Sequence, residues 1–84
     1  MRDVVLYGRD GCCLCDEARQ ALARIGARHP GAFRLQERDI ESDEDLLRRY
    51  LERIPVIEID GVEALELQVD EMELEQRLGI VQAR

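Results

Sequence analysis

All three cysteines of the 84-residue chain are crowded together, as Cys12, Cys13 and Cys15. Cys12 and Cys15 form a C-x-x-C pair between an apolar run and an amphipathic helical pattern. At a helix start, unpaired backbone N–H groups and the positive end of the helix dipole stabilise a thiolate at the first cysteine. The second cysteine follows one helical turn later, close enough to attack a mixed disulfide formed at the first. This spacing favours thiol–disulfide exchange, with Cys12 as nucleophile and Cys15 as resolving thiol.

Other interpretations of the cysteines remain open. A structural disulfide is disfavoured because it would close only a short loop and is uncommon in cytosolic chains. A zinc site could draw on the three cysteines and His29. His29, however, falls past the far end of the expected helix, roughly 20 Å away at about 1.5 Å per residue, so one chain cannot close a tetrahedral site. We therefore expect no metal ligands within one chain; chance cysteines at a packed helix start are the third alternative.

Hydrophobic patterning predicts the elements around the cysteines. The β-branched and aromatic run Val4–Tyr7 predicts a buried strand before them. After them, apolar residues recur at helical spacing, and the helix should end between Gly26 and Pro30. The apolar residues of this pattern are Leu14, Ala18, Ala21, Leu22 and Ile25. A second, half-buried strand is expected to begin at residues 32–35 and to run toward Asp39.

A short helix should follow the second strand. Ser42 and Asp45 resemble a capping box that opens a helix through Leu51. Pro55 forbids continuation of this helix. From the sequence alone, Pro55 is simply a proline at the start of a strand.

A hairpin and a last helix complete the pattern. Strands over residues 56–59 and 62–67 flank Asp60-Gly61, a strong hairpin signal. Asp70 can cap the last helix, which should stop at Gly79. The predicted order is β-α-β-α-β-β-α, an α/β fold with a four-stranded mixed sheet flanked by helices.

Length and charge limit the function classes. The chain has 12 basic residues, all arginine, against 19 acidic residues, for a formal charge of -7. Because phosphate contacts need clustered cations, we expect no nucleic-acid partner, and membrane surfaces are disfavoured likewise. Without lysine, Schiff-base chemistry is excluded. No spanning segment or signal-peptide pattern is found, so we expect a single cytoplasmic domain over residues 1–84 that acts as a monomer.

The motifs resemble those of a known family. The stretch Tyr7–Cys15 is similar to the active-site stretch of glutaredoxins, and Arg53–Val56 with Asp60-Gly61 is similar to their second signature segment. The chain resembles short glutaredoxin-like proteins of the thioredoxin fold over nearly its whole length.

The resemblance implies roles for single residues. Cys12 matches the nucleophile and Cys15 the resolving thiol. Pro55 matches the family's cis-proline, and Ile54 before it matches the residue whose backbone faces an extended substrate. Arg9 matches a basic position that helps to hold a glutathione carboxylate; a solvated loop arginine is the alternative.

Three positions depart from the family pattern. Asp70 alone remains of the stretch that holds glutathione before the last helix, and its capping role explains it without a ligand. Asp16 and Glu17 follow Cys15 where the family often has basic residues, and like charge should make Cys12 less acidic. Cys13 has no family role and is expected to be a bystander thiol or, alternatively, a second redox or metal-binding thiol.

The sequence thus predicts a glutaredoxin-like thiol–disulfide oxidoreductase that serves electron transport and cell redox homeostasis. A protein disulfide or a glutathione mixed disulfide is its expected substrate, without a bound cofactor, and glutathione is a candidate reductant. The alternatives are an iron–sulfur or other metal-binding thiol module and a non-catalytic domain whose acidic surface meets a basic partner.

Overall fold

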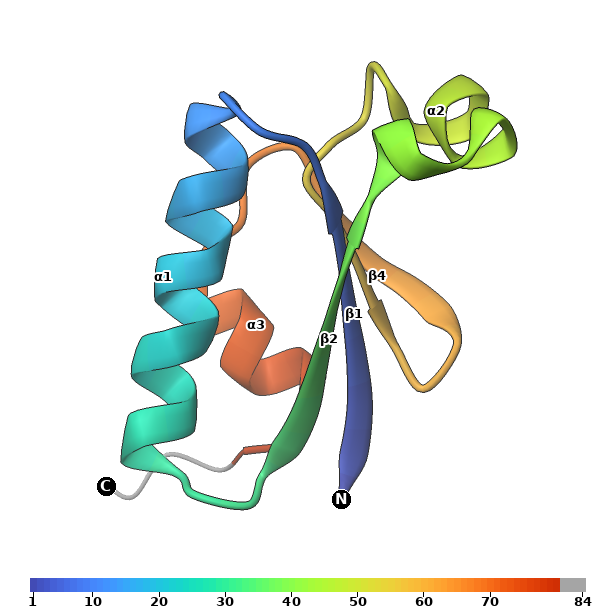
Figure 1. The fold of residues 1–84 in the computed structure, drawn as a ribbon. Helices are drawn as coiled ribbons and strands as arrows, with labels where there is room; N and C mark the ends of the chain where they lie inside the picture. The colour runs from blue at the N-terminus through green and yellow to red at the C-terminus, as the bar shows by residue number, and fades with distance from the viewer. Residues whose placement is uncertain (81–84) are drawn as a thin grey trace.

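The computed structural model describes residues 1–80. Its elements, in chain order, are β1 (Arg2–Gly8), α1 (Cys13–Arg28), β2 (Phe33–Asp39), the 3-10 helix η1 (Ile40–Ser42), α2 (Glu44–Tyr50), β3 (Val56–Ile59), β4 (Val62–Glu66) and α3 (Glu71–Arg77). The predicted β-α-β-α-β-β-α order is confirmed (Figure 1).

The four strands form one mixed sheet in the order β2-β1-β3-β4. β1 pairs with β2 in parallel and with β3 antiparallel, and β3 pairs with β4 antiparallel. The hairpin turn that joins β3 to β4 places Asp60 and Gly61 at φ 52° and 83°, the left-handed region that Asp-Gly pairs favour in tight hairpins. The predicted four-stranded mixed sheet is therefore confirmed.

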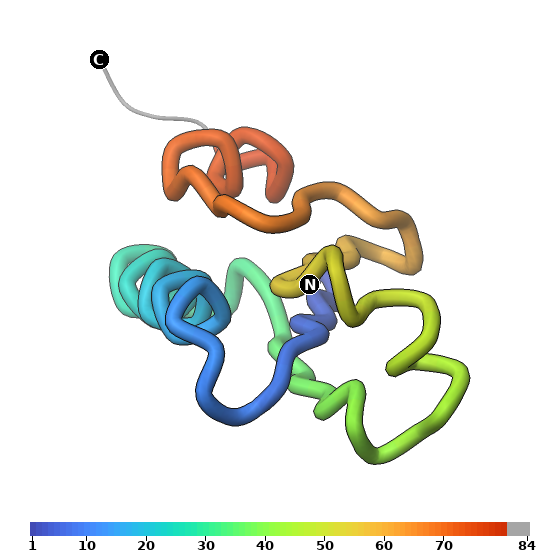
Figure 2. Tube along the Cα trace, turned by 90° about the horizontal axis from the view of Figure 1, so that it is seen from above, coloured from blue at the N-terminus to red at the C-terminus, as the bar shows by residue number. Residues whose placement is uncertain are grey.

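Helices cover the two faces of the sheet unequally. α1 and α3 pack on one face, over a core that includes Val4, Leu6 and Ile57 from the strands. α2 covers only one end of the opposite face, where Tyr7 and Val56 meet Ile40 and Tyr50. Figure 2 shows α1 and α3 on one side of the strands and α2 on the other. Both cores reach the end of β1 that leads into the cysteines.

The opposite face is held by aromatic and charged side chains. Tyr7 stacks on Tyr50 with ring centroids 4.6 Å apart. The Tyr7 hydroxyl donates to Glu58 at 3.2 Å, and the Tyr50 hydroxyl donates to Glu63 at 3.2 Å. Burial is the main cause that raises the pKa of Tyr7, and the nearby Glu58 carboxylate adds to it. These contacts anchor the segment that leads from α2 into β3.

The start of α2 differs from the prediction. Asp43 is the N-cap, because its side chain accepts the Asp45 N–H at 2.8 Å. Ser42 instead ends η1, and its hydroxyl donates to the Asp39 carbonyl at 2.6 Å. The inserted 3-10 turn moves the cap one residue further than the Ser42 capping box predicted.

Candidate functional site

Cys12 is the N-cap of α1, as the helix-start interpretation of the motif requires. Its backbone is extended, at φ -99° and ψ 108°, and its carbonyl accepts the Asp16 N–H at 3.0 Å. Its Sγ accepts the Cys15 N–H at 3.1 Å. A sulfur in this position receives a backbone donor and faces the positive end of the helix dipole. Both effects favour a thiolate at Cys12 when the pair is reduced.

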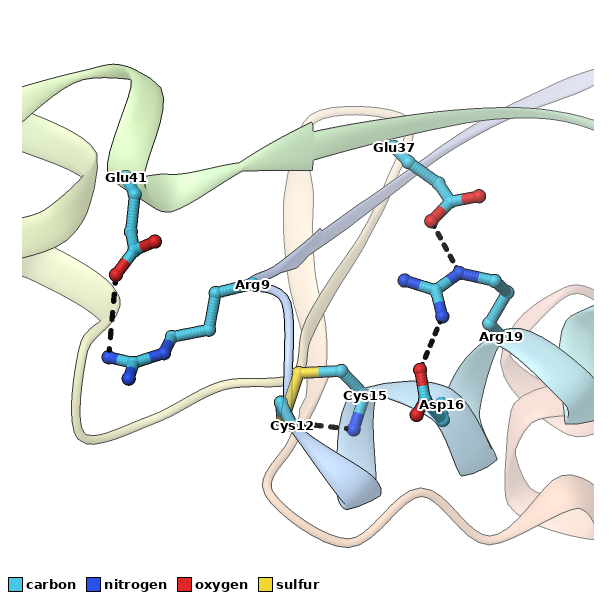
Figure 3. The surroundings of a disulfide bond; sticks show 7 residues. All are labelled: Arg9, Cys12, Cys15, Asp16, Arg19, Glu37 and Glu41. Atoms are coloured by element: carbon cyan, nitrogen blue, oxygen red, sulfur yellow. Dashed lines mark hydrogen bonds and ion pairs between the residues drawn. A yellow bond between two sulfur atoms is a disulfide. The ribbon is translucent and has the colours of Figure 1, made fainter.

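Cys12 and Cys15 form a disulfide, with their Cα atoms 5.2 Å apart (Figure 3). Cys15 is completely buried, whereas Cys12 is half-buried. A Cβ added at Gly8 would lie 3.0 Å from the Cys15 Sγ, so the end of β1 forms the inner wall against Cys15. Cys13, between the two, is a free and exposed cysteine. Cys12 is therefore the more accessible sulfur of the pair.

The segment before β3 brings Pro55 to the same end of the sheet. The Ile54–Pro55 peptide bond is cis, and Pro55 is fully buried. Tyr7 pairs with Val56 in the antiparallel register, which places Pro55 level with Gly8. The Ile54 N–H donates to the Tyr50 carbonyl at 3.0 Å. Within residues 1–80, the Ile54 carbonyl accepts no backbone hydrogen bond.

Arg9 points away from the disulfide. Its guanidinium lies 3.8 Å from the Glu41 carboxylate (Figure 3). Arg9 also lines a cavity of about 210 Å³ with Gly8, Asp10 and Asp39. An arginine already facing a carboxylate attracts a second one less strongly, so Arg9 is less free for the carboxylate-binding role that the resemblance implied.

The negative charge of Asp16 is compensated by a neighbouring arginine. Its carboxylate lies 2.6 Å from Arg19, which also contacts Glu37 at 2.6 Å (Figure 3). Like-charge repulsion on the Cys12 thiolate from Asp16 is therefore weaker than the sequence alone suggested.

Asp70 caps α3 and lines a groove beside the cysteines. Its side chain accepts the Met72 N–H at 3.0 Å. The groove has a volume of about 400 Å³. Its lining residues are Leu14, Glu17, Gln68, Val69 and Asp70. Leu14 directly precedes Cys15, so the groove begins next to the cysteine pair on α1.

Metal-ligand geometry is not found around the cysteines. Among residues 1–80, no group of three or more His, Cys, Asp or Glu side chains could hold a metal ion. His29 follows the C-terminal end of α1, 3.5 Å from Glu75. No helix in this part of the chain is long and apolar enough to cross a membrane.

Sequence patterning did not identify all residues around the site. The i,i+3 spacing of Asp16 and Arg19 is a visible signal for their ion pair. Glu41 faces Arg9, and the segment before α3 faces Glu17, only through the tertiary fold. No local pattern in the sequence could have predicted that these residues are neighbours.

The comparisons with known proteins agree on the fold. A family model described as "Glutaredoxin-like domain (DUF836)" matches residues 3–79. No curated protein matches the chain. The structure is similar to protein Ne2328 from Nitrosomonas europaea, with a TM-score of 0.75 and 29% identity over 90% of this chain and 89% of that one.

Two further structures show the range of the similarity. Protein XcR50 from X. campestris has a TM-score of 0.72 and 38% identity, over 94% of this chain and 99% of the other. A mutant thioredoxin from Halobacterium salinarum has a TM-score of 0.67 and 16% identity, over 92% of this chain and 71% of the thioredoxin. This last likeness shows the thioredoxin fold.

Proposed function

The chain belongs to the glutaredoxin-like (DUF836) family, and from this premise we propose that it is a thiol–disulfide oxidoreductase. Cys12 is the nucleophile and Cys15 the resolving thiol. The observation that carries the proposal is the unequal placement of the pair: Cys12 is half-buried at the helix cap, and Cys15 is completely buried behind it.

The reaction exchanges two electrons and two protons. The Cys12 thiolate attacks one sulfur of a substrate disulfide, so that a Cys12–substrate disulfide forms and the other substrate sulfur leaves as a thiolate that takes up a proton. Cys15 then loses its proton and attacks the Cys12 sulfur. The Cys12–Cys15 disulfide forms, and the second substrate thiol is released. An external thiol donor must reduce the protein disulfide before the next cycle.

Glutathione and a dithiol protein are the two candidate classes of donor. The pairing of Arg9 with Glu41 leaves fewer cationic groups for a glutathione carboxylate, and Asp70, an anion that caps α3, repels such a carboxylate. We therefore expect a dithiol to regenerate the protein faster than glutathione does at equal thiol concentration. Regeneration by glutathione at the same rate would reverse this choice of donor without affecting the roles of the cysteines.

The function is tested by oxidising the reduced protein with a small neutral disulfide, 2-hydroxyethyl disulfide. We expect the wild-type chain to lose two thiols and to release two equivalents of 2-mercaptoethanol. Cys12→Ser should abolish the reaction, because the remaining thiols lack the helix-cap position.

Cys13→Ser is the matched control, since it removes an exposed neighbouring thiol. We expect it to keep the wild-type rate and the loss of two thiols. Equal loss of rate in the Cys12 and Cys13 variants would refute the assignment of Cys12 as the sole nucleophile.

A further inference from the structure

The groove beside the cysteines has two walls that are distant in sequence. Leu14 and Glu17 come from the first turns of α1, and Gln68, Val69 and Asp70 come from the segment between β4 and α3. Leu14 is 36% exposed, so an apolar side chain is open to the groove. Leu67, which precedes the second wall, is 45% exposed, and its N–H donates to the Pro55 carbonyl at 2.9 Å. The groove therefore begins beside Cys15 on α1, and its second wall directly follows a residue that is hydrogen-bonded to the cis-proline segment.

The groove carries negative charge that is not paired with an arginine within residues 1–80. Glu17 and Asp70 line it from opposite walls, and neither forms an ion pair within residues 1–80. Arg24, which lies two helical turns beyond Glu17 on α1, is held by Glu71 at 2.8 Å. Arg53, on the proline segment, is held by Glu63 and Glu66. The nearby arginines are thus engaged elsewhere.

The position of the groove determines what enters it. Leu14 lies between the two cysteines in the first turn of α1 and lines the groove, so a substrate bound to the Cys12 sulfur is held at the same end of α1 as the groove. The residues that flank the substrate cysteine are then near enough to reach it. An apolar side chain can pack on Leu14 and Val69, and a cationic one is attracted by the two carboxylates.

On this basis we propose that the groove receives a polypeptide segment of the substrate and selects lysine or arginine, beside an apolar residue, next to the reacting cysteine. The inference rests on the proposed oxidoreductase function and names its substrate class: basic protein disulfides. Glutathione, which carries two carboxylates and one ammonium group, fits this groove less well.

The test is the rate at which homodimeric peptide disulfides oxidise the reduced protein in a single turnover. Three peptides of one design place leucine and two lysines, two glutamines or two glutamates beside the cysteine. We expect the lysine peptide to react about tenfold faster than the glutamine peptide at low ionic strength, and the glutamate peptide to react more slowly than both. The lysine preference should fall toward unity at about 1 M salt, where the Debye length is about 3 Å.

Variants locate the preference in the groove. In Glu17→Gln/Asp70→Asn, where asparagine keeps the helix cap, the lysine-to-glutamine rate ratio should fall at least threefold. The matched control is Glu44→Gln/Glu52→Gln, which removes the same charge on the α2 side and should leave the ratio unchanged. An equal fall in both double variants, or equal rates for the three peptides, overturns the inference.

The reaction with 2-hydroxyethyl disulfide separates this inference from the proposed function. If the protein reduces that neutral compound but shows no lysine preference, only the groove assignment fails. If none of the disulfides oxidises the protein, the oxidoreductase function fails and the inference fails with it.

Discussion

Cys12 and Cys15 differ in their surroundings although they are three residues apart. The Cys12 sulfur receives the Cys15 N–H and lies at the surface end of α1. The Cys15 side chain is sealed against Gly8, where added side-chain volume would approach its sulfur to 3.0 Å. In the proposed mechanism, this difference assigns attack to Cys12 and resolution to Cys15.

The charge of Asp16 should act on Cys12 through Arg19. Arg19→Gln removes the cation that lies 2.6 Å from Asp16 and leaves the carboxylate uncompensated in the first turn of the helix. In a Cys13→Ser/Cys15→Ser background, we expect the Cys12 thiol to ionise about 0.2–0.7 pH units higher, as exposed charge interactions of this kind allow. Ultraviolet absorbance of the thiolate during a pH titration measures it.

Arg24→Gln is the control for this titration, because Arg24 pairs with Glu71, away from the cysteines. This variant should leave the pH at which the Cys12 thiol ionises unchanged. The same shift in both variants would mean that Cys12 responds to net charge rather than to Asp16.

The C-x-x-C spacing predicted the cap position of Cys12 because the helix and its start are local features of the sequence. The pairing of Arg9 with Glu41 could not be predicted, since β2 and η1 bring Glu41 there only in the folded chain. The second wall of the groove, formed by residues 68–70, could not be predicted either, because only the folded chain brings it beside α1. The position of Cys12 at the helix cap was therefore predictable from the sequence. The residues that the fold brings near the cysteines were not.

At the scale of elements, the ends of helices and strands show how local signals compete. Asp70 caps α3 as predicted, because no other good capping residue directly precedes the helix. Before α2, Ser42 and Asp43 are both good caps, and the 3-10 turn η1 decides for Asp43. β4 ends at Glu66 rather than at Leu67, because Leu67 takes φ 64° and donates its N–H to the carbonyls of Arg53 and Pro55.

Replacing one glycine inside a helix and one just after a helix by alanine should change the stability of the fold in opposite directions. Gly26 lies inside α1, and a Cβ there meets Phe33 at an ordinary 3.7 Å. Gly26→Ala should therefore raise the free energy of unfolding by about 0.5–1 kcal/mol, through helix propensity. Gly79 follows α3 at φ 77°, so Gly79→Ala should lower that free energy by about 1 kcal/mol.

Urea unfolding of both variants measures whether the free energy of unfolding rises in Gly26→Ala and falls in Gly79→Ala. Loss of stability in Gly26→Ala would show that the α1–β2 contact has no room for a methyl group. Unchanged stability in Gly79→Ala would show that the left-handed end of α3 does not constrain the chain.

At the scale of the whole molecule, ion pairs join elements that are distant in sequence. Arg2 contacts Asp60 at 2.9 Å across the sheet, and Arg28 contacts Glu71 at 2.7 Å between α1 and α3. The sequence predicted the order and topology of the elements from periodicity and turn signals, because these depend on residue type and spacing. It left the ion pairs unassigned, because with 12 basic and 19 acidic residues many pairings satisfy the same pattern.

Acid should destabilise the fold through these pairs. The Asp3 backbone N–H, followed by Arg2, lowers the pKa of Asp60; Arg53 lowers the pKa of Glu63; and Arg24 and Arg28 lower the pKa of Glu71. A carboxylate whose pKa is lower in the folded state stabilises it above the unfolded pKa, and this contribution is lost as pH falls through the folded pKa. We therefore expect the free energy of unfolding to fall as pH decreases below about 5.

Urea unfolding at a series of pH values measures this slope. Glu63→Gln should flatten the slope because it removes one of the three groups while keeping an acceptor for Tyr50. Glu52→Gln, which lacks an ion pair within residues 1–80, serves as the control. A free energy of unfolding that stays constant below pH 5 would contradict the prediction.

The central claim is that Cys12 attacks a disulfide and Cys15 releases the product. It is tested most directly by the intact mass of Cys15→Ser, and of Cys12→Ser/Cys15→Ser, after exposure to 2-hydroxyethyl disulfide. We expect one 2-mercaptoethanol adduct per chain in Cys15→Ser, located on Cys12 by peptide mapping, and no adduct in the double variant. An adduct of equal yield in both variants, carried by Cys13, would refute the role of Cys12 as the nucleophile.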